Sequence, residues 1–157
     1  MFETIVWATD GSEHADRALP YAKRLASAPD AALFVVHGNE LLTGRAAGYP
    51  VLADEDELEA KIRGQVAELR AEGFNTSVRV IRSAAAATAH MIADFARDVG
   101  ADVIVVGTRG HAPVTGLLLG SVTQRLLHIA PCPVFAIPAS SLDVEHKSER
   151  ETAAVAH

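Results

Sequence analysis

The chain has 157 residues, of which 49% are hydrophobic, 22% charged and 5% aromatic, a composition that suits one globular domain with an aliphatic core. Its net charge of −6 argues against a nucleic-acid binder, because non-specific affinity for polyanions comes from clustered Lys and Arg. The single cysteine excludes a disulfide framework and a thiolate metal cluster. No basic region precedes an apolar N-terminal run, and no run reaches the ~18 residues of a membrane span. We therefore expect a cytoplasmic protein that binds neither nucleic acid nor membrane.

The first third of the chain alternates between extended and helical patterns. The run ETIVWAT (3–9) is apolar and β-branched, and it predicts a strand that ends at DGS. From Ser12 onward apolar residues recur at helical spacing, and Pro20 should either bend this helix or mark its first turns. A second buried strand is predicted over 31–37, and the residues 39–53, with two glycines and a proline, indicate a long loop.

The rest of the chain repeats this alternation. Its predicted elements are, in order, a helix with Leu58, Ile62, Val66 and Leu69 on one face that ends at Gly73, a strand over 76–82, a helix over 84–100, a strand over 101–107, a helix from Ser121 to about Ala130 and a strand over 133–138. Apolar strands alternating with helices imply right-handed parallel crossovers. The sequence therefore predicts an α/β fold with a doubly wound parallel sheet and helices on both faces, whose ligand lies at the carboxyl ends of the strands.

The domain is expected to span residues 1–138. The remaining segment, 139–157, is polar and contains four acidic residues against two basic ones. We expect it to be a disordered C-terminal tail.

One glycine-rich segment, GTRGHAPVTGLLLGS, joins the predicted strand over 101–107 to the next helix. Its spacing matches neither the phosphate loop of NTPases nor the dinucleotide fingerprint. Gly107 ends a strand, so that the chain can turn there, and Gly120 and Ser121 open a helix whose N–H groups face the same crevice. Together with the hydroxyls of Ser121 and Thr123, these groups can hold a polyphosphate without a lysine. The alternative is that Ser121 is only a helix N-cap and that the glycines are turn residues.

This segment resembles the ATP-binding branch of the universal stress proteins, which carries G-x2-G-x9-G-(S/T). The flanking runs IVWATDGSEHADRAL, LFVVHGNE and ADVIVVG resemble the same family, and the resemblance covers Phe2 to Pro138. It implies a Rossmann-like, adenine nucleotide alpha hydrolase-like domain with sheet order 3-2-1-4-5. It also implies binding of ATP, ADP, AMP or cyclic AMP, and a homodimer formed through the last strand, Val134 to Ile137.

The resemblance also implies a role for individual residues. The adenine would lie against Ala8, Thr9, Asp10 and Gly38, the ribose against Val106 and Gly107, and the phosphates against Arg109, Gly110, Gly120, Ser121, Val122 and Thr123. The chain departs from the family pattern at two positions. Gly38 stands where the family often has valine against the adenine ring, and Ala86 stands where a glycine is common.

Several residues also have simpler explanations. Asp10 and Glu13 could form a capping box at the start of the first helix, and with the resemblance we expect Asp10 to serve both as cap and as adenine contact. His37 is interpreted as a core histidine at a strand end.

Catalysis is not indicated. Phosphoryl transfer needs metal ligands and charge neutralisation, whereas the glycine-rich loop offers one cation, Arg109, and no carboxylate beside the phosphates. Mg²⁺, if present, would arrive with the nucleotide, and no catalytic residue and no protein metal ligand is predicted.

The first hypothesis is therefore a nucleotide-binding stress or signalling module in which the nucleotide modulates conformation or assembly. The alternatives are a slow ATPase or adenylate-using enzyme, and an interaction protein that binds no nucleotide.

Overall fold

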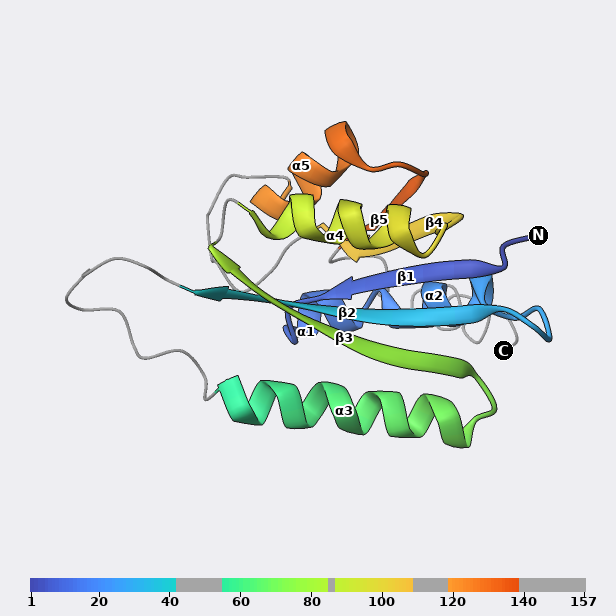
Figure 1. Ribbon diagram of the computed structural model, residues 1–157. Helices are drawn as coiled ribbons and strands as arrows, with labels where there is room; N and C mark the ends of the chain where they lie inside the picture. Colours follow the sequence, from blue (N-terminus) through green and yellow to red (C-terminus); the bar gives the residue numbers. More distant parts are fainter. Residues whose placement is uncertain (42–54, 85–86, 109–118, 139–157) are drawn as a thin grey trace, which may run out of the picture.

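The computed structural model describes residues 1–41, 55–84, 87–108 and 119–138 (Figure 1). In chain order its elements are β1 (Thr4–Thr9), α1 (Glu13–Asp16), α2 (Leu19–Leu25), β2 (Ala32–Leu41), α3 (Glu55–Ala71), β3 (Asn75–Ala84), α4 (Thr88–Asp98), β4 (Val103–Gly107), α5 (Ser121–Ile129) and β5 (Val134–Ile137). Most of the predicted loop over 39–53, Ala86, Arg109, Gly110 and the tail over 139–157 lie outside the described residues.

The strands form one parallel sheet in the order β3-β2-β1-β4-β5. This confirms the predicted doubly wound α/β fold and its strand order. The order reverses beside β1, which pairs with β2 on one side and with β4 on the other. In a sheet of this kind the crevice for a ligand opens at such a reversal, above the carboxyl ends of the strands.

Helices cover both faces of the sheet, with α1, α2 and α3 on one face and α4 and α5 on the other (Figure 1). Each face has its own apolar core. In the first core, Trp7, Leu33 and Val105 pack against alanines of α2 and the apolar stripe of α3. In the second core, side chains from the other face of β1, β2 and β4 pack against α4 and against Leu126 of α5; they are Val6, Val36, Ile104 and Val106. Because both faces are covered, the interior positions of β1 and β4 are apolar on both faces rather than alternating with polar ones.

The helix predicted from Ser12 onward is two helices, α1 and α2. Ser12 caps α1, whose C-cap is Arg17, and Pro20 lies in the first turn of α2. Proline has no N–H to donate to the carbonyl of Asp16, so a continuous helix would lose that hydrogen bond, whereas a first turn needs no such donor. Of the two alternatives for Pro20, the second is therefore confirmed.

The end of β2, the end of β3 and the start of α4 were predicted wrongly. The β2–β3 ladder continues from the pair His37–Val80 to the pair Leu41–Ala84, so both strands are longer than their apolar runs. The alanine-rich start of the predicted helix over 84–100 is therefore partly strand, and α4 begins only at Thr88. Alanine by itself favours helix over strand, so the pairing of β3 with β2 overrode the local preference at this boundary. No helix in the described part of the chain is long and apolar enough to cross a membrane.

Candidate functional site

The sheet brings the predicted residues of β1, β2 and β4 to one edge. Ala8 is paired with Val106 of β4, and Thr9 is paired with His37 of β2. Gly38 and Gly107 each follow directly on these positions. The strand ends on which the adenine and ribose contacts were predicted are thus neighbours, since parallel strands end on the same side.

The turn between β1 and α1, residues 10–12, is shaped by its own side chains. Thr9 Oγ1 accepts from the N–H of Gly11 at 3.1 Å, and Asp10 Oδ1 accepts from the N–H of Ser12 at 3.0 Å. Gly11 has φ +79°, which favours glycine. The turn thereby holds the half-buried Asp10 directly beyond the carboxyl end of β1.

The predicted capping box with Asp10 as N-cap is wrong. The N-cap of α1 is Ser12, whose Oγ accepts from the N–H of Ala15 at 3.2 Å. Asp10 stabilises the turn that precedes the helix, because its carboxylate accepts from the N–H of Ser12, the N-cap residue.

Gly107 is required by packing against α1. A Cβ at this position would lie 2.7 Å from the carbonyl oxygen of His14 and 3.3 Å from Cα of Ala15, both backbone atoms. The φ of Gly107 is not positive, so backbone sterics alone would admit another residue. The sequence predicts a turn or a ligand contact at this glycine, and the close approach of α1 is a further reason for it.

Gly38 has a similar neighbour on the other side of the sheet. A Cβ there would lie 2.6 Å from the side-chain methyl of Thr88, which is buried at the first turn of α4. The space that a valine side chain would take at this strand end is therefore partly filled by Thr88. Sequence reasoning did not single out Thr88, and no local pattern marks it, because the contact joins residues 50 positions apart.

The start of α5 lies at the same edge, because its first turn is hydrogen-bonded to the end of β4. Gly120 is its N-cap, with extended backbone, and the N–H of Gly120 donates to the carbonyl of Thr108 at 2.7 Å. The alternative in which Ser121 is the N-cap is therefore wrong: Ser121 is the exposed first residue of the helix. Because glycine has no side chain, the cap position supplies no acceptor to the first N–H groups of α5.

Thr123 serves a different purpose from the one expected of its hydroxyl. Thr123 is buried, and its Oγ1 donates to the carbonyl oxygen of Gly107 at 2.8 Å. This bond ties the first turn of α5 to the end of β4. The side-chain proton of Thr123 is thus used within the protein, and what remains for a ligand is its backbone N–H.

His37 is a buried core histidine at the end of its strand, as predicted. It is 1% exposed, and its Nδ1 lies 3.2 Å from the carbonyl oxygen of Thr9. It therefore supports the peptide that joins Thr9 to Asp10. Among the described residues no group of three His, Cys, Asp or Glu side chains could hold a metal ion.

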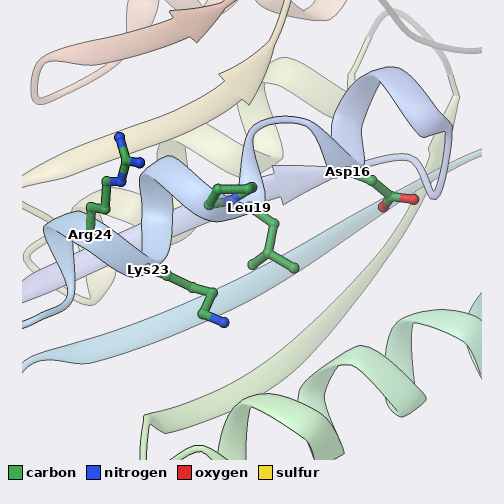
Figure 2. A pocket seen from close by; sticks show the side chains of 5 residues that line it. Asp16, Leu19, Lys23 and Arg24 are labelled. Atoms are coloured by element: carbon green, nitrogen blue, oxygen red, sulfur yellow. The ribbon is translucent and has the colours of Figure 1, made fainter. Parts of the chain in front are cut away.

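A pocket of about 400 Å³ lies elsewhere, on α1 and α2, and is lined by Asp16, Leu19, Pro20, Lys23 and Arg24 (Figure 2). It contains none of the predicted site residues. Two of its charged side chains already have partners, since Lys23 forms an ion pair with Glu72 and Asp16 forms one with Lys61. Arg24 and Lys23 leave α2 in different directions (Figure 2), so they do not converge on one ligand, and we assign this pocket no role.

The fold is that of a doubly wound α/β domain whose predicted adenine and ribose contacts lie at the carboxyl ends of neighbouring strands. The model of the universal stress protein family matches residues 1–138, and the chain belongs to that family. A universal stress protein of Thermus aquaticus is 38% identical over 141 residues, which cover 87% of this chain and 99% of that protein.

Two solved structures are similar as well. A universal stress protein in complex with cAMP is 25% identical, with a TM-score of 0.63 and coverage of 88% of this chain and 98% of its own. The hypothetical protein MJ0577 has a TM-score of 0.72 at 23% identity, covering 88% and 96% of the two chains. The likeness to MJ0577 shows that the two chains share a fold, and the first structure is a universal stress protein that holds cAMP.

Proposed function

We propose that this protein binds adenine nucleotides, ATP among them, at the carboxyl edge of its sheet, as a stress or signalling module of the ATP-binding branch. The observation that carries the proposal is the start of α5, a nine-residue helix whose cap, Gly120, offers no side-chain acceptor, beside the end of β4. Such a helix start attracts phosphate through its N–H groups and its dipole. The relative in complex with cAMP supports adenosine phosphates as the ligand class.

The proposed contacts divide along the nucleotide. Asp10, with Ala8, Thr9 and Gly38, would bind the adenine. Val106 and Gly107 would lie against the ribose. The phosphates would meet Gly120, Ser121, Val122 and the backbone N–H of Thr123, together with Arg109 and Gly110, which lie outside the described residues.

We propose in addition that two copies associate through β5. This strand has one hydrogen-bonding neighbour, β4, among the described strands. Its Phe135 is 43% exposed and packs edge-to-face on Phe2 at 6.4 Å. Pairing with a second β5 would cover both the open backbone and this ring. Light scattering should give a dimer for the wild type and a monomer for Phe135→Lys; a wild-type monomer would contradict the pairing.

Titration calorimetry of nucleotide-stripped protein tests the binding proposal. We expect heat with ATP, and with ADP, AMP or cAMP, and we expect Gly120→Val to abolish it, because a side chain there would block the approach of a phosphate. Gly64→Val is the matched control, since a Cβ on Gly64 in α3 meets nothing within 4 Å. No heat with any of the four nucleotides would end the proposal.

A second candidate, an interaction protein that binds no nucleotide, draws on one observation. Packing alone explains why two of the predicted contact residues are glycines, since a Cβ on Gly107 would collide with α1 and a Cβ on Gly38 would collide with Thr88. This alternative requires that millimolar ATP leave the melting temperature unchanged, whereas a binder is stabilised by mass action. If ATP binds, equal phosphate release by wild type and Gly120→Val would exclude hydrolysis at this site.

A further inference from the structure

A lysine of α3 contacts the turn that carries Asp10. Lys61 Nζ donates to the carbonyl oxygen of Gly11 at 2.7 Å and lies 2.5 Å from Oδ2 of Asp16. We propose that Lys61 is a positioning residue that holds Asp10 in place for the base of the nucleotide. This inference rests on the proposed function, and it deepens that function by assigning the selectivity for the base in part to a residue that need not touch the ligand.

The internal hydrogen bonds of the turn set its shape but not its place. Thr9 Oγ1 and Asp10 Oδ1 bond the N–H groups of Gly11 and Ser12, all within four consecutive residues. Those bonds would survive if the turn moved as a unit. A fixed place requires contacts from elements that are distant in the sequence.

Two such contacts come from α3. Leu58 packs against Gly11 so closely that a Cβ on the glycine would lie 2.9 Å from its Cδ2. One turn further along the helix, Lys61 bonds the carbonyl of the same glycine. The apolar contact limits movement toward α3, and the charged hydrogen bond limits movement away from it, because such bonds are directional and stronger than neutral ones.

Lys61 is itself held in position. Its second partner, Asp16, also accepts from Gln65 Nε2 at 3.0 Å, so that Asp16 joins two side chains on successive turns of α3. The long side chain of Lys61, 40% exposed, thereby has a carboxylate and a carbonyl as joint acceptors. From the β2 side, Nδ1 of His37 contacts the carbonyl of Thr9. The peptide that joins Thr9 to Asp10 and the peptide that joins Gly11 to Ser12 are thus held by two different elements.

Lys61→Met tests the proposal, because it keeps the length of the side chain and removes the donor. Arg63→Met is the matched control: Arg63 lies on the same helix, is 61% exposed, and pairs with Glu59 at 3.7 Å. The first readout needs no ligand. Hydrogen exchange of the N–H groups of Gly11 and Ser12 should accelerate in Lys61→Met and stay at the wild-type rate in Arg63→Met.

The second readout compares ligands. We expect Lys61→Met to raise the Kd for ATP about tenfold, the scale of one lost hydrogen bond to a charged group, and to lower the preference for ATP over GTP. The Kd for inorganic tripolyphosphate should stay unchanged, since that ligand has no base. A parallel loss of tripolyphosphate affinity would show instead that Lys61 attracts phosphate as a charge, and would overturn the positioning role.

Two further variants strengthen the test. Lys61→Arg keeps a cationic donor and should restore part of the preference for ATP. Asp16→Asn keeps the bond to Gly11 while weakening the support of Lys61, and should shift the preference less than Lys61→Met does. If Lys61→Met fails to fold, the same two measurements are made on Asp16→Asn. The proposal would then be overturned if Asp16→Asn kept the wild-type preference for ATP over GTP and the wild-type exchange rates of the Gly11 and Ser12 N–H groups.

The failure of this inference and that of the proposed function are distinct. If the wild type binds no nucleotide, the function is wrong, and the exchange experiment still decides whether Lys61 holds the turn. If the wild type binds ATP and Lys61→Met matches Arg63→Met in exchange rate, affinity and preference, the positioning role is wrong and the function stands.

Discussion

The two edges of the sheet differ in how their backbone N–H groups are hydrogen-bonded. At the amino edge, Asp102 closes the start of the central strands: its Oδ2 accepts from the N–H groups of Glu3 at 2.8 Å and Thr4 at 2.9 Å. The N–H of Asp102 in turn donates to the carbonyl of Thr4 at 2.8 Å. At the carboxyl edge, side chains hold loops and helix starts in place, while the cap of α5 supplies no acceptor. The first edge satisfies these groups within the protein, whereas the second leaves the first N–H groups of α5 without a side-chain acceptor at the cap.

Cys132 is influenced by the same carboxylate at the amino edge. It lies just before β5, near the amino edge, where burial raises the pKa of its thiol and the charge of Asp102 raises it further. The thiol is therefore protonated at neutral pH and a poor nucleophile. Cys132 therefore adds no reactive thiolate to that edge.

The largest expected effect on folding stability comes from Gly107→Ala at the carboxyl edge. The new Cβ would meet the backbone of α1, which cannot move aside as a side chain can. We expect a loss of about 1–3 kcal/mol in the free energy of unfolding, typical of overpacking, together with weaker ATP binding. Urea denaturation and calorimetry measure the two. Unchanged stability would show that α1 is not anchored on β4.

Thr123→Val separates the structural role of Thr123 from a ligand role. It removes the buried hydroxyl that donates to Gly107, and we expect a loss of about 1 kcal/mol in the free energy of unfolding. Because the backbone N–H remains, the Kd for ATP should change less than in Gly120→Val. A loss of binding without a loss of stability would show instead that the hydroxyl contacts the phosphates.

Asp102→Asn tests the amino edge through pH. The backbone N–H groups of Thr4 and Glu3 hold the pKa of Asp102 below its ordinary value of 3.8. A carboxyl whose pKa is lower in the folded state stabilises the protein above the pKa of the unfolded state, and this stabilisation is lost as the pH falls through the folded pKa.

The variant should therefore be less stable than wild type at pH 7, and the two should converge in acid below pH 3.8. Denaturant titrations at several pH values measure the difference. Nucleotide affinity at pH 7 should be unchanged, and a loss of affinity would contradict the separation of the two edges.

The smallest expected effect is a gain from Gly64→Ala in α3. This position is exposed and a Cβ there meets no neighbour, so we expect about 0.5–1 kcal/mol of added stability from the lower chain entropy of alanine. Thermal unfolding measures it, and no gain would show that the unfolded chain is already restricted there.

Much of the fold could be predicted because its signals are local. The apolar runs of β1 and β4, the stripe of Leu58, Ile62, Val66 and Leu69 on α3, and the stop at Gly73, which has φ +94°, each depend on neighbouring residues. The boundaries of β2, β3 and α4 could not be predicted, because the ladder between residues distant in sequence determined where they end.

The candidate site divides in the same way. The sequence by itself determined the ends of β1 and β4, the glycines and the turn with Asp10, since spacing and residue type carry that information. Only the tertiary structure decided that α1 packs too closely on Gly107 for a side chain, that Thr123 donates to the end of β4, and that Lys61 donates to Gly11, 50 residues earlier in the chain. Such contacts form when separate elements pack together, and packing depends on the summed shape of distant side chains, which no short stretch of sequence records.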